Sequence, residues 1–220
     1  MTTRVKVCGI TRVEDATLAA DLGASAIGFI FWPRSARFIP PARAAAIAAA
    51  LPPSIVCVGV FVDQPLQDMQ SIASQVPLGA VQLHGVETPE VAAALMQPVI
   101  KAVPVIDDFD PASLDVWPPA VTVLLDAHDP VRRGGTGRTI DWSVAARAAR
   151  RRPVMLSGGL TPENVREAVE AVRPYAIDLS SGVETAPGVK DPARLRALFE
   201  NLPGLQTPPA GTAGSTDPAH

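Results

Sequence analysis

A cysteine and an aspartate, each at the end of a short apolar run, have the side chains of a base and an acid. Cys8 ends the run Arg4–Cys8, and Asp126 directly follows Val121–Leu125. A thiol has an ordinary pKa of about 8.5 that a nearby cation lowers, whereas partial burial raises the pKa of a carboxyl group. A thiolate that accepts a proton and a carboxylic acid that donates one would suit an isomerisation by proton transfer.

Both residues also have a structural interpretation. Most cysteines are small buried hydrophobic residues, and an aspartate after a strand can cap the following loop. Strand alternation favours a functional Cys8, because Val5 and Val7 share one face while Lys6 and Cys8 share the other. We expect the valines to face covering helices and the other two side chains to point inward. Cys57, between two valines, is interpreted as packing.

Two runs of small residues are candidates for binding a phosphate group. Ser157-Gly158-Gly159 and Ser180-Ser181-Gly182 follow the last two apolar runs of the chain. Small residues let backbone N–H groups approach an anion, and loops in these positions often bind phosphate in barrels. Either run alone would be an ordinary tight turn. The glycines of Gly134-Gly135-Thr136-Gly137 lack P-loop spacing, and we interpret them as part of a mobile loop.

Three further polar residues occupy positions at or near strand ends. Arg37 would either bind a carboxylate through two parallel hydrogen bonds or be a solvated surface arginine. His84 shares a strand face with Gln82 and would either orient a substrate or hydrogen-bond a loop carbonyl. Asp178 would neighbour Lys6 if the first and last strands were adjacent. That pair would be structural or would tune the thiol.

Eight apolar runs alternate with helical patterns, which predicts parallel strands covered on both faces. The expected strands are Arg4–Cys8, Ala26–Phe31, Ile55–Val62, Ala80–Leu83, Val99–Val103, Thr122–Leu125, Val154–Leu156 and Ala176–Leu179. The prediction is an α/β fold, a single-domain (β/α)8 TIM barrel over residues 1–203. An open doubly wound sheet is the alternative, but no G-x-G-x-x-G follows the first strand. We expect residues 204–220, rich in Pro, Gly and Thr, to be a disordered tail.

Composition excludes several classes of protein. A net charge of −3 over 220 residues gives no basic surface for nucleic acid. No run approaches the roughly 18 apolar residues of a membrane span, and no signal peptide is visible. Two cysteines and three histidines have no metal-ligand spacing. We therefore expect a cytoplasmic protein without a metal, and the sequence leaves its oligomeric state open.

Taken together, these motifs resemble those of the phosphoribosylanthranilate isomerases of tryptophan biosynthesis. The resemblance covers about residues 4–202 and rests on Lys6–Thr11, Gly28–Phe31 with Pro33, Ser35 and Arg37, Gln82–Gly85, Leu124–Asp126, Gly134–Gly137, Leu156–Leu160 and Asp178–Glu184. It implies an Amadori rearrangement of N-(5-phosphoribosyl)anthranilate, a small phosphorylated substrate, into 1-(2-carboxyphenylamino)-1-deoxyribulose 5-phosphate. It also implies that no cofactor is needed, because the nitrogen of the substrate serves as the electron sink.

The resemblance assigns roles to the candidate residues. Asp126 would be the general acid, Cys8 the general base, and Arg37 the ligand of the anthranilate carboxylate. The backbone of Gly158, Gly159 and Ser180–Gly182 would hold the phosphate, and we expect His84 and Asp178 to contact the substrate. Another phosphate-binding barrel, such as a sugar-phosphate epimerase or a ribonucleotide isomerase, and a barrel that binds phosphate without catalysis are the alternatives. The cysteine and aspartate pair argues against the other isomerases, which would use paired carboxylates or metal ligands.

Overall fold

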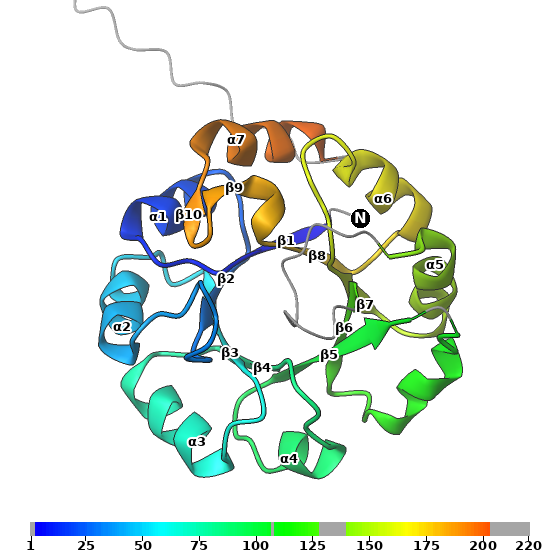
Figure 1. Cartoon of the computed structure of the whole chain (residues 1–220), viewed down its shortest axis with the longest axis horizontal. Coiled ribbons are helices and arrows are strands. Elements are labelled where there is room, and N and C mark those ends of the chain that lie inside the picture. The colour runs from blue at the N-terminus through cyan, green and yellow to red at the C-terminus, as the bar shows by residue number, and fades with distance from the viewer. Residues whose placement is uncertain (1–2, 107, 128–139, 203–220) are drawn as a thin grey trace, which may run out of the picture.

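The computed structural model describes residues 3–106, 108–127 and 140–202, which form a closed parallel barrel ringed by helices (Figure 1). Its strands lie in chain order: β1 (Arg4–Cys8), β2 (Ala26–Ile30), β3 (Val56–Phe61), β4 (Ala80–Leu83), β5 (Val99–Val105), β6 (Thr122–Ala127), β7 (Val154–Leu156) and β8 (Ala176–Leu179). β8 pairs with β1 and closes the barrel. The predicted (β/α)8 fold is confirmed, and the open sheet is excluded. The glycine run 134–137 and residues 204–220 lie outside the described part of the chain.

Seven α-helices in the described ranges pack around the strands. They are α1 (Val13–Asp21), α2 (Pro41–Ala49), α3 (Leu66–Gln75), α4 (Pro89–Ala93), α5 (Trp142–Arg151), α6 (Val165–Val172) and α7 (Pro192–Asn201). Local sequence sets several of their starts. Asp191 caps α7 by accepting hydrogen bonds from the N–H groups of Ala193 and Arg194, and Pro192 takes the first helical position. The fifth strand–helix unit differs, because β5 is followed by the 3₁₀ helix η1 (Pro111–Val116).

The connection after β8 is more ordered than the sequence predicted. We expected a loop over residues 180–190, and this was wrong. The segment contains the 3₁₀ helix η2 (Ser181–Val183) and an antiparallel hairpin of β9 (Glu184–Ala186) and β10 (Val189–Lys190). The hairpin turns at Gly188, whose φ of 80° is left-handed and favours glycine. In Figure 1 this segment lies over the β1 and β8 side of the barrel.

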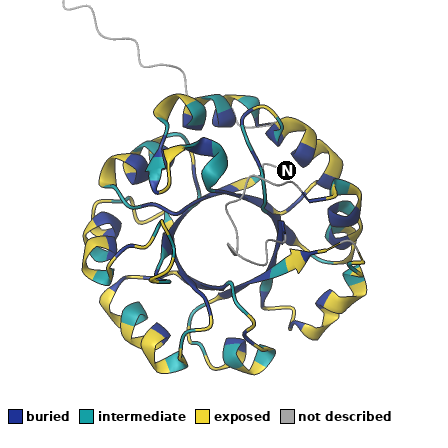
Figure 2. Cartoon of the chain, viewed as in Figure 1, coloured by how far each residue is buried: buried dark blue, intermediate teal, exposed yellow. Residues whose placement is uncertain are grey.

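Strand alternation separates two hydrophobic cores. Outward-facing residues, among them Val5 and Val7, pack against the helices in the larger core. The smaller core fills the barrel interior and consists of Val58, Ala80, Ile100, Ala102, Leu124, Met155 and Ala176. Figure 2 shows the resulting ring of buried strands inside helices whose outer faces are exposed. The interior is therefore packed, and polar inward-facing residues lie above it at the carboxyl ends of the strands.

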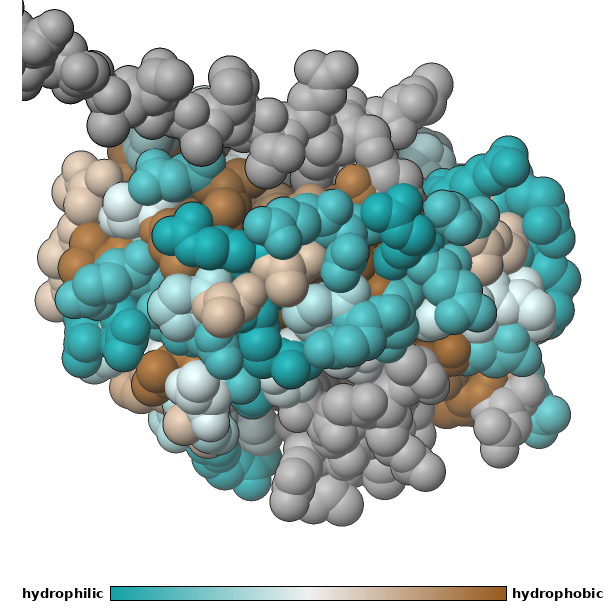
Figure 3. Space-filling view, turned by 90° about the horizontal axis from the view of Figure 1, so that it is seen from above, coloured by the Kyte–Doolittle hydropathy of each residue, from teal (hydrophilic) through white to brown (hydrophobic). Residues whose placement is uncertain are grey.

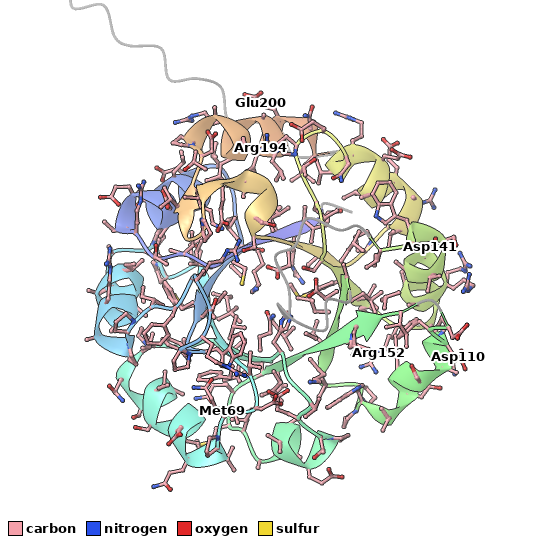
Figure 4. All side chains as sticks on the ribbon, viewed as in Figure 1. Met69, Asp110, Asp141, Arg152, Arg194 and Glu200 are labelled. Carbon is pink, nitrogen blue, oxygen red and sulfur yellow. The ribbon has the colours of Figure 1, made fainter. Side chains whose placement is uncertain are left out.

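No helix in the described ranges is long and apolar enough to cross a membrane. On the face seen in Figure 3, hydrophilic residues predominate and hydrophobic ones occupy separate small areas. Arg152, labelled in Figure 4, follows α5 and donates hydrogen bonds to the carbonyls of Leu114, Trp117, Pro118 and Val121. This arginine therefore holds the connection between η1 and β6.

Candidate active site

Lys6 and Cys8 point into the barrel from β1, as strand alternation predicted. Both side chains are buried, at 1% and 6% exposure. The Lys6 Nζ atom donates a hydrogen bond of 2.8 Å to Oδ1 of Asp178 on β8, and the side chains of Lys6 and Cys8 also hydrogen-bond. The predicted Lys6–Asp178 pair is thus confirmed. Its basis is register, because these two residues lie opposite each other where the first and last strands meet.

The environment of Cys8 holds its thiol in the protonated form at neutral pH. Burial raises the pKa of Cys8, and the positive charges of Lys6 and Lys190 oppose this effect without cancelling it. Burial also opposes the charge on Lys6, but attraction to Asp178 and Cys8 outweighs it and raises the pKa of Lys6. Lys6 therefore stays charged and favours the thiolate, although burial is the larger influence on the thiol.

Gly28 on β2 makes room for this cluster. A Cβ atom built at this position would lie 2.8 Å from Cys8 Sγ and 3.2 Å from Lys6 Nζ. Gly28 is the register partner of Cys8, so its missing side chain leaves space directly beside the thiol. The sequence motif contained this glycine, but only the strand pairing shows why a larger residue would be excluded.

The side chains of Gln82, His84 and Asp126 form a hydrogen-bonded chain that ends at the carboxyl end of β6. Gln82 Nε2 lies 2.8 Å from His84 Nδ1, and His84 Nε2 lies 3.2 Å from Asp126 Oδ2. An amide nitrogen can only donate, so Nδ1 accepts and Nε2 carries the hydrogen that points at the carboxylate. The alternative in which His84 hydrogen-bonds a loop carbonyl is not observed among the described residues, and its role in orienting a substrate stays a prediction. In this structure both of its ring nitrogens are bonded to side chains.

Asp178 connects the two halves of the site. It pairs with Lys6, its charge acts on the Cys8 thiol, and it is close enough to Asp126 and His84 to interact electrostatically with both. Asp126 and Asp178 are both buried, at 7% and 6% exposure. The candidate base from β1 and the candidate acid from β6 thus share one cluster of charged groups inside the barrel mouth.

Arg37 is held by an acid that the sequence analysis did not assign. Its Nε and Nη2 atoms donate to the Glu184 carboxylate at 3.0 and 2.7 Å. Lys190 Nζ donates to the same carboxylate at 2.8 Å and to the carbonyl oxygens of Cys8 and Ser180 at 2.6 and 3.2 Å. Burial disfavours the charge on Glu184, but these bonds outweigh it and lower its pKa. Arg37 Nη1 donates no hydrogen bond to any residue that the structure describes.

The two small-residue runs meet at the carboxyl ends of β7 and β8. Gly158 and Gly159 have φ angles of 89° and 62°, both left-handed. A Cβ atom at Gly182 would overlap the carbonyl of Leu160, so the two loops are in direct contact. Backbone in this conformation and without side chains can approach an anion closely. The loops are therefore adjacent, as phosphate binding between them requires.

Glu184 and Lys190 belong to the site but were not predicted from the sequence. Glu184 was part of a recognised motif but had no role, and Lys190 was placed at the end of a loop. The sequence around each residue does not indicate its role, because the partners lie elsewhere in the chain. Lys190 bonds to β1 and the β8 loop, and Glu184 bonds to Arg37. Within the described ranges, no group of three or more His, Cys, Asp or Glu side chains could hold a metal ion.

Comparison with known proteins places this geometry in a family. The family model for N-(5'-phosphoribosyl)anthranilate isomerase matches residues 5–201. The isomerase of Geobacter metallireducens is 49% identical over 196 residues, which cover 89% of this chain and 96% of that protein. The crystal structure of the Thermus thermophilus isomerase has a TM-score of 0.83 and 48% identity, covering 90% of this chain and 98% of that one. A second structure, 42% identical with a TM-score of 0.82, covers 92% of this chain and 100% of that one and contains reduced 1-(o-carboxyphenylamino)-1-deoxyribulose 5-phosphate. The chain belongs to the phosphoribosylanthranilate isomerase family.

Proposed function

We propose that this chain converts N-(5'-phosphoribosyl)anthranilate into 1-(2-carboxyphenylamino)-1-deoxyribulose 5-phosphate by general acid–base catalysis, as a step in tryptophan biosynthesis. The observation that carries the mechanism is the placement of Cys8 and Asp126. Both are buried on the inner face of the barrel, and the charge of Asp178 reaches both. The family match supports the reaction, and the relative that contains a reduced product analogue supports a phosphorylated substrate.

Asp126 is the proposed acid. It donates a proton to the ribose ring oxygen, the ring opens, and the anthranilate nitrogen forms a Schiff base with C1. His84 orients the carboxyl group through the bond from Nε2 to Oδ2. Asp126 Oδ1 has no hydrogen-bond partner among the described residues, so it is the oxygen from which the proton leaves.

Cys8 is the proposed base. Its thiolate removes the proton from C2, and the electrons of that C–H bond move toward the Schiff-base nitrogen to give an enolamine. The enolamine then tautomerises to the ketone. The charge of Lys6, at hydrogen-bond distance from the thiol, stabilises the thiolate before the proton is taken.

The remaining side chains bind the substrate. The carboxylate of anthranilate would lie against Arg37 Nη1, since Glu184 accepts hydrogen bonds from the Nε and Nη2 edge of the guanidinium. Asp178 would accept a hydrogen bond from a ribose hydroxyl, and His84 would also contact the substrate. The backbone of Gly158, Gly159, Ser180, Ser181 and Gly182 would hold the phosphate.

The test is the loss of anthranilate fluorescence when purified protein is added to freshly made phosphoribosylanthranilate, with excess product-consuming enzyme. We expect an enzyme-dependent decay, much faster than that of a control without protein. A decay no faster than the control, from folded protein, would contradict the assignment. Phosphate-ligand binding and sugar-phosphate epimerisation would then be measured in its place.

Two broader proposals accompany this one. We propose that residues 1–203 form the complete catalytic domain, which the family match over residues 5–201 supports. We also propose a cytoplasmic location, because Cys8 and Cys57 are both free thiols and the base must stay reduced. Fractionation of cells that produce the protein would check the location.

A further inference from the structure

Gln82 is a buried amide whose carbonyl has no partner in the described part of the chain. The residue is 1% exposed, and its Oε1 atom accepts no hydrogen bond from any residue that the structure describes. Below it the barrel interior is apolar, since Ala80 and Ile100 belong to the inner core. An amide carbonyl that is buried without a partner destabilises a fold, and an apolar side chain of similar size would avoid this cost. The amide at this position therefore calls for an explanation other than packing.

The only side-chain bond of Gln82 points to that explanation. Its Nε2 atom is 2.8 Å from His84 Nδ1, two residues further along the same face of β4. A histidine with an accepting Nδ1 carries its hydrogen on Nε2, and the Nε2 atom of His84 is 3.2 Å from Asp126 Oδ2. The amide thereby decides which nitrogen of the imidazole faces the candidate acid with a hydrogen.

We propose that Gln82 is a positioning residue that fixes His84 as the Nε2–H tautomer and so directs a hydrogen bond to Asp126. This inference rests on the proposed function. The bond to Oδ2 holds the carboxyl group in one orientation and leaves Oδ1 to carry the transferred proton. It also stabilises the carboxylate that remains after the proton has gone, which strengthens the acid.

The opposite tautomer would weaken the acid. With hydrogen on Nδ1, a bare Nε2 would face Asp126 and accept a hydrogen bond from its protonated form. The proton would then be retained between the two side chains instead of passing to the substrate. The nearby titratable groups are Lys6, Cys8 and Asp178, and Glu87 and Lys101 form their own pair at 2.8 Å. Gln82 is the only one of His84's described partners that acts at Nδ1.

Nitrogen NMR of the histidine rings tests the tautomer directly. The chain has three histidines, so protein labelled with [15N]histidine gives few ring signals, and the His84→Gln variant identifies those of His84. We expect the wild-type protein to show hydrogen on Nε2. Gln82→Glu, whose carboxylate can only accept, should move the hydrogen to Nδ1. Gln82→Met, which has similar length and no hydrogen bond, should give a mixture.

Turnover provides the second readout. We expect Gln82→Met to lower kcat about tenfold with KM changed less than about twofold, since binding groups are untouched. Ile100→Val is the matched control, because Ile100 is the inward-facing register partner of Gln82 and lacks polar atoms. It should leave both the tautomer and kcat unchanged.

Clear outcomes would overturn the proposal. A wild-type His84 with hydrogen on Nδ1, or an Nε2–H tautomer that persists in both Gln82 variants, removes Gln82 from this role. If Gln82→Met does not fold, the spectra of the wild-type protein and of Gln82→Glu still show whether Gln82 sets the tautomer of His84. The spectra are independent of turnover, so failure of the proposed function would be seen separately, as absence of isomerase activity in a protein with the expected tautomer.

Discussion

At the scale of single residues, the thiol of Cys8 rests in the form that cannot act as a base. Burial raises its pKa, so the thiolate fraction is small at neutral pH and grows as the pH rises. The proton must leave before or as the substrate binds. The charge of Lys6 lowers the free energy needed to remove this proton, because it favours the thiolate. As a thiol, the proposed base reacts little with other electrophiles before the substrate binds.

The pKa of the Cys8 thiol can be measured in a variant that has no other cysteine. In the Cys57→Ala background only Cys8 remains, and ultraviolet absorbance of the thiolate should give a midpoint above the ordinary value of about 8.5. Adding Lys6→Met together with Asp178→Asn removes the cation without leaving a buried charge unpaired, and should move the midpoint higher. A midpoint below the ordinary value would show that Lys6 and Lys190 outweigh burial.

Removing either of the two proposed catalytic groups should greatly lower turnover without unfolding the protein. We expect Cys8→Ala and Asp126→Asn each to lower kcat by about 10³-fold, in the range for general acid–base groups. Cys57→Ala is the matched control, since this cysteine is also buried but belongs to the outer core. The fluorescence assay measures kcat, and circular dichroism checks folding. Near wild-type turnover in either variant would remove that residue from its role.

At the scale of elements, the hairpin after β8 supports residues that other elements supply. Lys190 on β10 bonds to the backbone of Cys8 at the end of β1 and of Ser180 after β8. Glu184 on β9 accepts from both Lys190 and Arg37, which lies in the β2–α2 connection. One hairpin thus fixes the base, the expected phosphate loop and the arginine relative to one another.

The charge on Glu184 makes this arrangement sensitive to acid. Its pKa is lowered in the folded protein, so its stabilising effect is complete above the unfolded value of about 4.3 and is lost as the pH falls through the folded value. We expect Glu184→Gln to lower the free energy of unfolding by about 2 kcal/mol at pH 7. Urea unfolding at several pH values should show this difference shrinking below about pH 4. A difference that does not vary with pH would contradict an ionic role.

The same elements show what sequence patterns can and cannot predict. All eight strands were predicted near their observed positions, because runs of valine, isoleucine and leucine reflect burial on both faces. Alternation along β1 also placed Lys6 and Cys8 correctly. The role of Gly28 and the Lys190 contacts were not predicted, because they depend on the pairing of β1 with β2 and on the contact of β10 with the end of β1. The hairpin of β9 and β10 was not predicted either. Local patterns therefore locate the candidate acid and base but not the groups that hold them.

At the scale of the whole molecule, the family match and the described barrel end almost together. The match ends at residue 201, and α7 ends at Asn201. The proposed catalytic groups lie on strands between residues 4 and 179, with their supporting hairpin ending at Lys190. The mechanism proposed above therefore uses no residue of the range 204–220.

Truncation tests this domain boundary. A chain that ends at residue 203 should keep kcat and KM within about twofold of the full chain, because a change outside the site leaves binding and chemistry intact. A chain that ends at residue 190 is the control, since it lacks α7, whose Leu195, Leu198 and Phe199 belong to the main core. We expect it not to fold. Loss of activity on truncation at 203 would place part of the site beyond the proposed domain.

Pairing of the first and last strands has a consequence for the protein during its synthesis. Cys8 leaves the ribosome before Asp178 and Lys190, which are made near the end of the described chain. A growing chain of 150 residues already contains the base, the acid and Arg37, yet Lys6 has no counter-ion and Gly28 no closed barrel around it. The thiol acquires its tuned environment only when the last strand docks. On the proposed mechanism, chemistry would thus be confined to molecules whose last strand has docked.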